Sequence, residues 1–255
     1  MPLEGDKSIA IIEDISERTR IDAVRTDFVA NISHELKTPV GALAVLAEAL
    51  SQEDDLEIIH RLSEKMVDEA IRVGRTIDDL LELSRIEFGG EAVKDEVDAA
   101  VILSESISRA APLASLHSIK IAMAELSTPL KVVGDRRQLV SAIGNLVENA
   151  VKYSESGSSV EVSARPDGDS VEFAVTDFGL GIPARDLDRV FERFYRVDRA
   201  RSRDTGGTGL GLAIVHETIQ QLGGTVSVSD LPDQAGTCFT VTLPAVPDGA
   251  IDDAP

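Results

Sequence analysis

The stretch FVANISHELKTP, residues 28–39, decides the fold because it lies inside a long helical pattern. Apolar residues recur there and beyond at steps of three or four: Val29, Ile32, Leu36, Val40, Leu43, Leu46 and Leu50. This period is that of one face of an α-helix. We therefore expect a helix from Thr19 to about Ser51, where the polar cluster of residues 51–55 ends the pattern.

A second helical pattern follows with the same period. Its apolar residues are Ile59, Leu62, Met66, Ala70, Val73, Ile77, Leu80 and Leu83, and Gly89-Gly90 ends it. Each helix would be about 45 Å long at the usual rise per residue. A lone pair of such helices buries too little apolar surface, so we predict that a second copy completes a four-helix bundle and makes a homodimer. The alternative is that the apolar faces of these two helices pack against another part of the same chain.

After Gly90, short strand patterns alternate with helical ones, which predicts an α/β layer domain. The expected strands are Ser118–Ala124, Leu130–Gly134, Ser158–Ala164, Ser170–Thr176, Thr225–Ser229 and Thr237–Leu243. The expected helices are Ala99–Ala114, Arg136–Tyr153 and Leu210–Leu222. Residues 179–207 are rich in glycine and arginine, and a loop of that length in a compact domain is usually functional.

Composition narrows the class of protein. The 255 residues carry a net charge of −20, which argues against direct nucleic-acid binding because that needs a basic face. No run of 18 apolar residues occurs, so no membrane-spanning helix is predicted. Cys238 is the single cysteine, which excludes an internal disulfide.

His34 has neighbours that favour chemistry over packing, although a lone helical histidine is more often structural. Neutral imidazole is a nucleophile near pH 7. Glu35 is adjacent and could accept the proton from the other ring nitrogen. Thr38 lies one turn further on, where its hydroxyl could hold a water beside the same imidazole. Pro39 removes a helix hydrogen bond and predicts a kink there.

The segment NLVENAVKY, residues 145–153, favours a site for a metal and a phosphate. Asn145 and Asn149 are four residues apart and share one face of the expected helix. Asn149 offers a carbonyl oxygen of the kind that Mg²⁺ prefers. Lys152 could meet a phosphate as a point charge.

Two glycine-rich segments favour the binding of a nucleotide. In DFGLGI, residues 177–182, the Asp177 carboxylate can accept a hydrogen bond from an adenine amino group, and the glycines let the backbone approach the base. The segment GGTGLGLA, residues 206–213, opens a helix, where backbone amides form an anion site. Between them, FERFYR at residues 191–196 and arginines further along place positive charge in an acidic chain.

The HELKTP stretch resembles the H-box of two-component sensor histidine kinases. The later segments are similar, in the family's order, to its N-box, first glycine box, F-box and second glycine box, over residues from about 20 to 245. The sequence pattern as a whole looks closest to that of the actinobacterial phosphate-responsive kinases of the PhoR type. His216 is a departure, since many relatives carry lysine there.

The resemblance implies an α plus α/β fold, with a two-helix hairpin in a dimeric four-helix bundle and then an α/β sandwich ATP-binding domain of the GHKL (Bergerat) type. The hairpin for dimerisation and histidine phosphotransfer would span residues 19–89 and the catalytic domain residues 90–246. Residues 1–18, with a strand-like run at Ile9–Ile15, would be the remnant of an upstream sensor or linker, and residues 247–255 a disordered tail. A hinge is expected near Phe88–Gly90.

The resemblance also implies roles for individual residues. His34 would be the phosphoacceptor, Glu35 its acid/base partner, and Thr38 would serve dephosphorylation of the partner protein. Asn149 would hold Mg²⁺. ATP would be bound by Asn145, Asn149, Lys152, Tyr153, Asp177, Gly179, Gly181, Ile182, Arg196, Gly207, Thr208, Gly209, Leu210, Gly211 and Leu212.

The expected activity is autophosphorylation of His34 followed by transfer to an aspartate of a response regulator, with phosphatase activity toward that regulator. The chain would be the cytoplasmic portion of a membrane-anchored receptor. Asp177-Phe178-Gly179 spells the metal-binding motif of Ser/Thr protein kinases, but that family is excluded. The sequence has no His-Arg-Asp loop, and its glycine loop follows the Asp-Phe-Gly motif instead of preceding it. A silent scaffold or a phosphatase-only switch stays open as the alternative.

Overall fold

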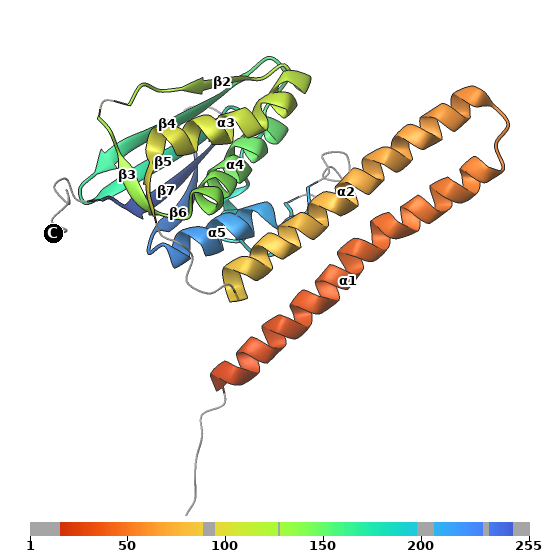
Figure 1. Cartoon of the computed structure of the whole chain (residues 1–255), viewed down its shortest axis with the longest axis horizontal. Coiled ribbons are helices and arrows are strands. Elements are labelled where there is room, and N and C mark those ends of the chain that lie inside the picture. The colour runs from red at the N-terminus through yellow and green to blue at the C-terminus, as the bar shows by residue number, and fades with distance from the viewer. Residues whose placement is uncertain (1–15, 89–94, 127, 198–206, 232–234, 247–255) are drawn as a thin grey trace, which may run out of the picture. The chain divides into compact units, whose positions relative to one another are not determined.

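The computed structural model describes residues 16–88, 95–126, 128–197, 207–231 and 235–246 (Figure 1). In the first helix, side chains are described from Ile32 onward, except those of His34 and Glu35. The chain forms two compact units, Met1–Val73 and Gly74–Pro255, and each is considered by itself. The predictions for Ile9–Ile15, for Gly89-Gly90 and for the tail from residue 247 concern segments outside the described residues.

Two long helices make the N-terminal part, as the periodicity predicts. Helix α1 spans Ser16–Ser51 and α2 spans Leu56–Phe88. Asp55 caps α2, because its Oδ1 accepts the backbone N–H of Glu57 at 2.8 Å. At Pro39 the expected kink does not break the helix, since α1 continues through that residue. None of the helices in the described residues is long and apolar enough to cross a lipid bilayer.

The second unit is a layer of helices on a mixed sheet. Its strands are β1 Asp95–Asp98, β2 Lys120–Met123, β3 Lys131–Gly134, β4 Ser159–Asp167, β5 Ser170–Asp177, β6 Thr225–Asp230 and β7 Thr237–Pro244. Its helices are the part of α2 from Gly74 onward, α3 Ala99–Leu116, α4 Arg136–Tyr153, the 3₁₀ turn Ala184–Asp186 and α5 Gly211–Gln221. The main sheet has the order β2-β4-β5-β7-β6, in which only β2 and β4 pair in parallel.

The core lies between the sheet and α3, α4 and α5, which Figure 1 shows in front of the strands. Alternate residues of β5 point into it, so that Val171, Phe173 and Val175 are buried while their neighbours are half-buried. The same alternation carries Asp177, the last residue of β5, to the buried side at the end of the strand. The strand pattern thereby positions a carboxylate at the edge of the core.

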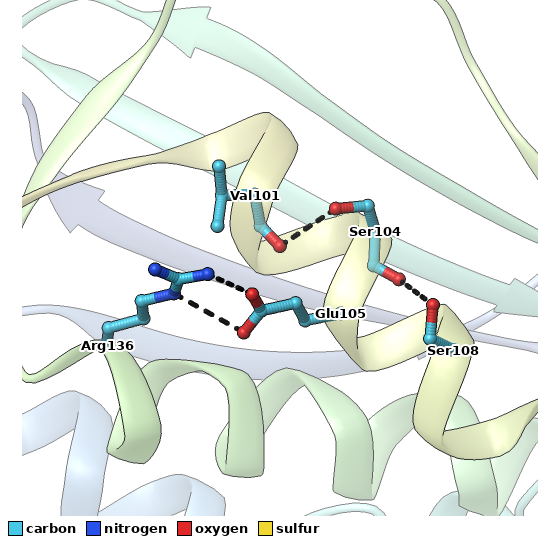
Figure 2. A network of polar contacts seen from close by, with 5 residues as sticks. All are labelled: Val101, Ser104, Glu105, Ser108 and Arg136. Atoms are coloured by element: carbon cyan, nitrogen blue, oxygen red, sulfur yellow. Dashed lines mark hydrogen bonds and ion pairs between the residues drawn. The ribbon is translucent and has the colours of Figure 1, made fainter.

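Helices α3 and α4 are held side by side in a fixed register. Figure 2 shows the guanidinium of Arg136, at the start of α4, bonded to both carboxylate oxygens of Glu105 on α3. One residue further along α3, the buried Ser106 hydroxyl donates to the Val140 carbonyl oxygen at 3.1 Å. A slip of one turn would break the exposed ion pair and leave the buried Ser106 hydroxyl without its acceptor.

Strand β1 is the element that the sequence pattern misses. Its residues read DEVD, a composition that is poor in strand formers. It forms because it pairs with β3 in a small antiparallel sheet, with Asp95 opposite Gly134. Its last residue, Asp98, also caps α3 by accepting the Ala100 N–H at 2.7 Å.

Candidate functional site

A cavity of about 1230 Å³ lies in the unit that begins at Gly74. Its walls are α4, the turn after β5, the glycine segment before α5 and the last half of α2. Thirteen of the residues singled out from the sequence line it: Asn145, Asn149, Lys152, Tyr153, Asp177, Gly181, Ile182, Arg196, Gly207, Thr208, Gly209, Gly211 and Leu212. Gly179 and Leu210 do not line it, and Leu210 is fully buried.

Asp177 is the buried acid of the cavity, with 3% of its surface exposed. Burial raises its pKa, and hydrogen bonds from the backbone N–H groups of Gly179 and Thr237 act in the opposite direction. The Gly179 N–H donates to Oδ1 at 3.0 Å. A side chain at Gly179 would overlap the carbonyl oxygen of Tyr153, at the end of α4. The glycine therefore lets the turn close against α4 and holds one carboxylate oxygen in place.

Helix α4 supplies the polar wall. Asn145, Glu148, Asn149 and Lys152 all line the cavity, and the Lys152 ammonium lies 3.5 Å from the Glu148 carboxylate. The opposite face of the same helix is buried in the core. An amphipathic pattern on one helix thus provides both the packing and the site.

The first turn of α5 faces Asn145. A Cβ built on Gly211, the first residue of α5, would lie 3.5 Å from Asn145 Oδ1, so the helix end and the amide share one corner of the cavity. Unpaired N–H groups at a helix N-terminus carry partial positive charge and favour an anion. This corner is suited to phosphate.

The amide oxygens of α4 fit a hard cation. The described residues include no group of three or more histidine, cysteine, aspartate or glutamate side chains that could hold a metal ion by themselves. Mg²⁺ usually takes few protein ligands and completes its shell with phosphate and water oxygens. Asn149 is the residue that would hold it, alongside the ligand's own oxygens.

The glycine segment is tied to its surroundings by two contacts. The Thr208 hydroxyl donates to Asp79 Oδ2 on α2 at 2.7 Å, and burial raises the pKa of Asp79 although this hydrogen bond opposes the shift. Gly209 has φ +73° and lies so close to the Phe194 backbone that a Cβ would come within 2.9 Å of it. The Phe194 N–H donates to the Gly209 carbonyl at 2.8 Å. Only glycine fits this position.

Phe191 packs against the core rather than lining the cavity. Its ring meets Phe239 of β7 edge-on, with centroids 6.3 Å apart. On its other side lies His216 of α5, at 5.8 Å. His216 is therefore accommodated by packing. The arginines that follow this segment in the sequence, at positions 199, 201 and 203, lie outside the described residues.

Several cavity residues escaped the sequence reasoning. Arg75, Asp78, Asp79 and Glu82 come from the polar positions of α2, and Arg109 comes from α3. They belong to no motif and follow only the helical period, so no spacing could have marked them. Tertiary packing alone brings them to the cavity.

His34, Glu35 and Thr38 lie on α1, in the unit Met1–Val73. Thr38 is exposed one helical turn beyond His34. The side chains of His34 and Glu35 lie outside the described part of the chain, so their roles stay predictions.

Two family descriptions match separate stretches of the chain. "His Kinase A (phospho-acceptor) domain" matches residues 24–89. "Histidine kinase-, DNA gyrase B-, and HSP90-like ATPase" matches residues 134–247. The first covers the hairpin, and the second covers α4, the glycine segments, α5 and the four strands β4 to β7.

Individual proteins are similar over most of the chain. Sensor-like histidine kinase SenX3 of Mycolicibacterium smegmatis is 48% identical over 250 residues, which is 96% of this chain and 64% of that protein. The chain therefore spans less than two thirds of this curated relative. The solved structure of the mycobacterial sensor histidine kinase MprB is 33% identical, with a TM-score of 0.53, over 61% of this chain and 99% of that chain.

The histidine kinase ThkA, solved in complex with response regulator protein TrrA, has the same fold. Its TM-score is 0.72 over 92% of this chain and 66% of that chain, at 18% identity. At this identity the likeness concerns the fold alone.

Asp177→Asn is expected to raise the free energy of unfolding at neutral pH by about 1 kcal/mol, because an amide avoids the burial of a charge and still accepts the Gly179 N–H. The pKa of the carboxyl is raised above 3.8 in the folded chain. Its contribution to stability is therefore fully present below the ordinary value and is lost as pH rises through the raised pKa. Urea titrations at several pH values measure both effects.

The exposed Asp188→Asn is the control, and it should leave both quantities unchanged. An Asp177→Asn variant that is less stable than the wild type would contradict the conclusion that burial of this carboxylate costs stability. So would a variant that loses as much stability as the wild type when the pH is raised.

Proposed function

Because this chain belongs to the two-component sensor histidine kinases, we propose that it transfers a phosphoryl group from ATP to its own His34 and then to an aspartate of a response regulator. The observation that carries the proposal is the cavity, in which α4, Asp177 and the glycine segment meet around one space. A family description that includes gyrase-like ATPases covers the same residues.

The two ends of the cavity suit the two ends of ATP. At one end, the Asp177 carboxylate accepts hydrogen bonds from the backbone N–H groups of Gly179 and Thr237, and its two oxygens have lone pairs left to accept a hydrogen bond from the adenine amino group. At the other end, Asn145 and the N-terminus of α5 meet the phosphates. Lys152 and Arg196 line the cavity and add positive charge for the chain of phosphates.

Mg²⁺ bound beside Asn149 would supply charge neutralisation for the phosphates. The protein's own contribution is to orient them. Asn145 and Asn149 lie on one face of a helix whose other face is fixed in the core, so their amides are held in place.

The first reaction forms a bond between a His34 ring nitrogen and the terminal phosphorus. The bond from that phosphorus to the bridging oxygen breaks, and ADP leaves with the electron pair. Glu35 takes the proton from the other ring nitrogen. In the second reaction the P–N bond breaks as an aspartate oxygen of the regulator bonds to phosphorus, and His34 recovers its electron pair.

The more specific predictions belong to the same proposal. The response regulator partner is in keeping with ThkA, which was solved with one. Thr38 would hold the water that removes the phosphoryl group from the regulator. Anchoring of the full-length protein in a membrane and a place among the PhoR-type kinases are part of the proposal too.

Labelling with γ-labelled ATP and Mg²⁺ is the direct test. The wild-type chain should acquire acid-labile, base-stable label, since that is the behaviour of phosphohistidine, and His34→Gln should acquire none. His60→Gln, an exposed histidine of the same hairpin, is the matched control and should be labelled like the wild type. Label that persists in His34→Gln would assign another acceptor.

Thr38→Ala should retain autophosphorylation and lose most of the phosphatase activity toward the phosphorylated regulator, by about tenfold or more. The reason is that the methyl group cannot hold the attacking water. Loss of phosphate from the regulator measures the effect, and Thr38→Ser, which keeps the hydroxyl, should behave like the wild type. Full phosphatase activity in the alanine variant would remove Thr38 from the mechanism.

We further propose that the hairpin forms a homodimer. In the unit Met1–Val73, α2 exposes Val67 and Ile71 by 58% and 49%, and α1 exposes Val40 and Val45 by 53% and 66%. Val67 and Ile71 are four residues apart and share one face of α2. Apolar side chains aligned along a helix gain stability from a partner helix, and a second copy of the hairpin offers the same stripe.

Replacing both Val67 and Ile71 with glutamate should convert a dimer to a monomer, because four carboxylates would be brought into the apolar seam. Analytical ultracentrifugation measures the mass. Lys65→Glu changes an exposed residue on the opposite side of α2 and should stay dimeric. If the double variant remained a dimer, or if the wild type were a monomer, the proposed dimer interface would be refuted.

A further inference from the structure

Arg109 lines the cavity from α3, away from every sequence motif. Three atoms of its guanidinium group, Cζ, Nε and Nη1, are all 3.8 Å from the Cβ position of Gly144 on α4. Equal distances to three atoms of a planar group mean that the guanidinium lies flat over the glycine. Arg109 thus reaches the cavity across the one residue of this α4 turn that has no side chain.

The α3–α4 register fixes this position. The Glu105–Arg136 ion pair in Figure 2 and the Ser106–Val140 hydrogen bond come one turn earlier along α3. Glu105 is four residues before Arg109 and is engaged by Arg136. Within the part of the chain that the structure describes, Arg109 forms no ion pair. Its guanidinium therefore lines the cavity without a carboxylate in direct contact among the described residues.

The position along α4 determines what Arg109 would meet. The Asp177 turn abuts Tyr153, at the C-terminal end of α4, whereas Gly211 faces Asn145 and the guanidinium covers Gly144. These two ends are separated by nine residues, or about 13 Å along the helix axis. If the base lies at Asp177, as in the proposed function, the phosphate chain runs toward Asn145, and its last member arrives next to Arg109.

We propose that Arg109 binds the terminal phosphate of the nucleoside triphosphate and makes the site select ATP over ADP. The guanidinium presents a fork of N–H donors that matches two phosphate oxygens. Lys152 is already paired with Glu148, so it is less free to respond to the third phosphate. The proposal rests on the proposed function, because it takes the orientation of the nucleotide from it.

The test compares the affinities of the whole chain for Mg²⁺-ATP and Mg²⁺-ADP by titration calorimetry. Arg109→Gln should lose about tenfold or more in ATP affinity, as expected for the loss of charged hydrogen bonds, while ADP affinity changes less than about twofold. Arg109→Lys restores the charge but not the fork, and should recover part of the ATP affinity.

Arg165→Gln is the matched control. Arg165 lies on β4, is exposed and pairs with Glu172 away from the cavity, so its loss removes the same charge elsewhere. It should leave the ratio of ATP to ADP affinity unchanged. The thermal midpoint of Arg109→Gln should match that of the wild type, because Arg109 is exposed.

Each outcome decides the proposal. A selective loss of ATP affinity in Arg109→Gln, absent from Arg165→Gln, supports it. Equal loss of both nucleotides, or no loss, overturns the role of Arg109 and leaves the proposed function standing. A wild-type chain that binds neither nucleotide overturns both together.

Discussion

The structure depends on the packing of one face of α4. Ile143, Leu146 and Val147 are fully buried against α3 and the sheet, and the polar side of the same helix lines the cavity. Burying each such side chain contributes about 1.5–3 kcal/mol, so the helix cannot rotate to move its polar residues without losing core contacts. The orientation of Asn145, Asn149 and Lys152 is therefore a consequence of apolar packing rather than of their own interactions.

The same constraint explains why the site needs little backbone adjustment elsewhere. With α4 fixed, the β5 turn is held against its C-terminal end and α5 against Asn145, in each case through a glycine at the contact. This arrangement destabilises the ionised form of Asp177, since the alternation of β5 brings its carboxylate to the buried side and burial raises its pKa. A ligand that donates a hydrogen bond to this buried carboxylate would stabilise its ionised form.

Much of this could be predicted from the sequence because it is local. The span Arg136–Tyr153 was predicted with the bounds that α4 has, and the glycine segments fell beside helix and strand ends as their pattern indicates. Strand β1 could not be predicted, because its DEVD sequence becomes a strand only by pairing with β3. Arg109 and Asp79 reach the cavity through contacts between elements far apart in the sequence, which no periodicity records.

The glycine contacts also bear on how this chain can vary over evolution. At Gly179 and Gly209 the obstacle to any side chain is backbone, of Tyr153 and Phe194 respectively, so no change of rotamer or neighbouring side chain can make room. In a crowded core, a larger side chain can be accommodated by a smaller neighbouring side chain. That kind of compensation is not available at these two sites. A side chain at either position would therefore require the backbone itself to move.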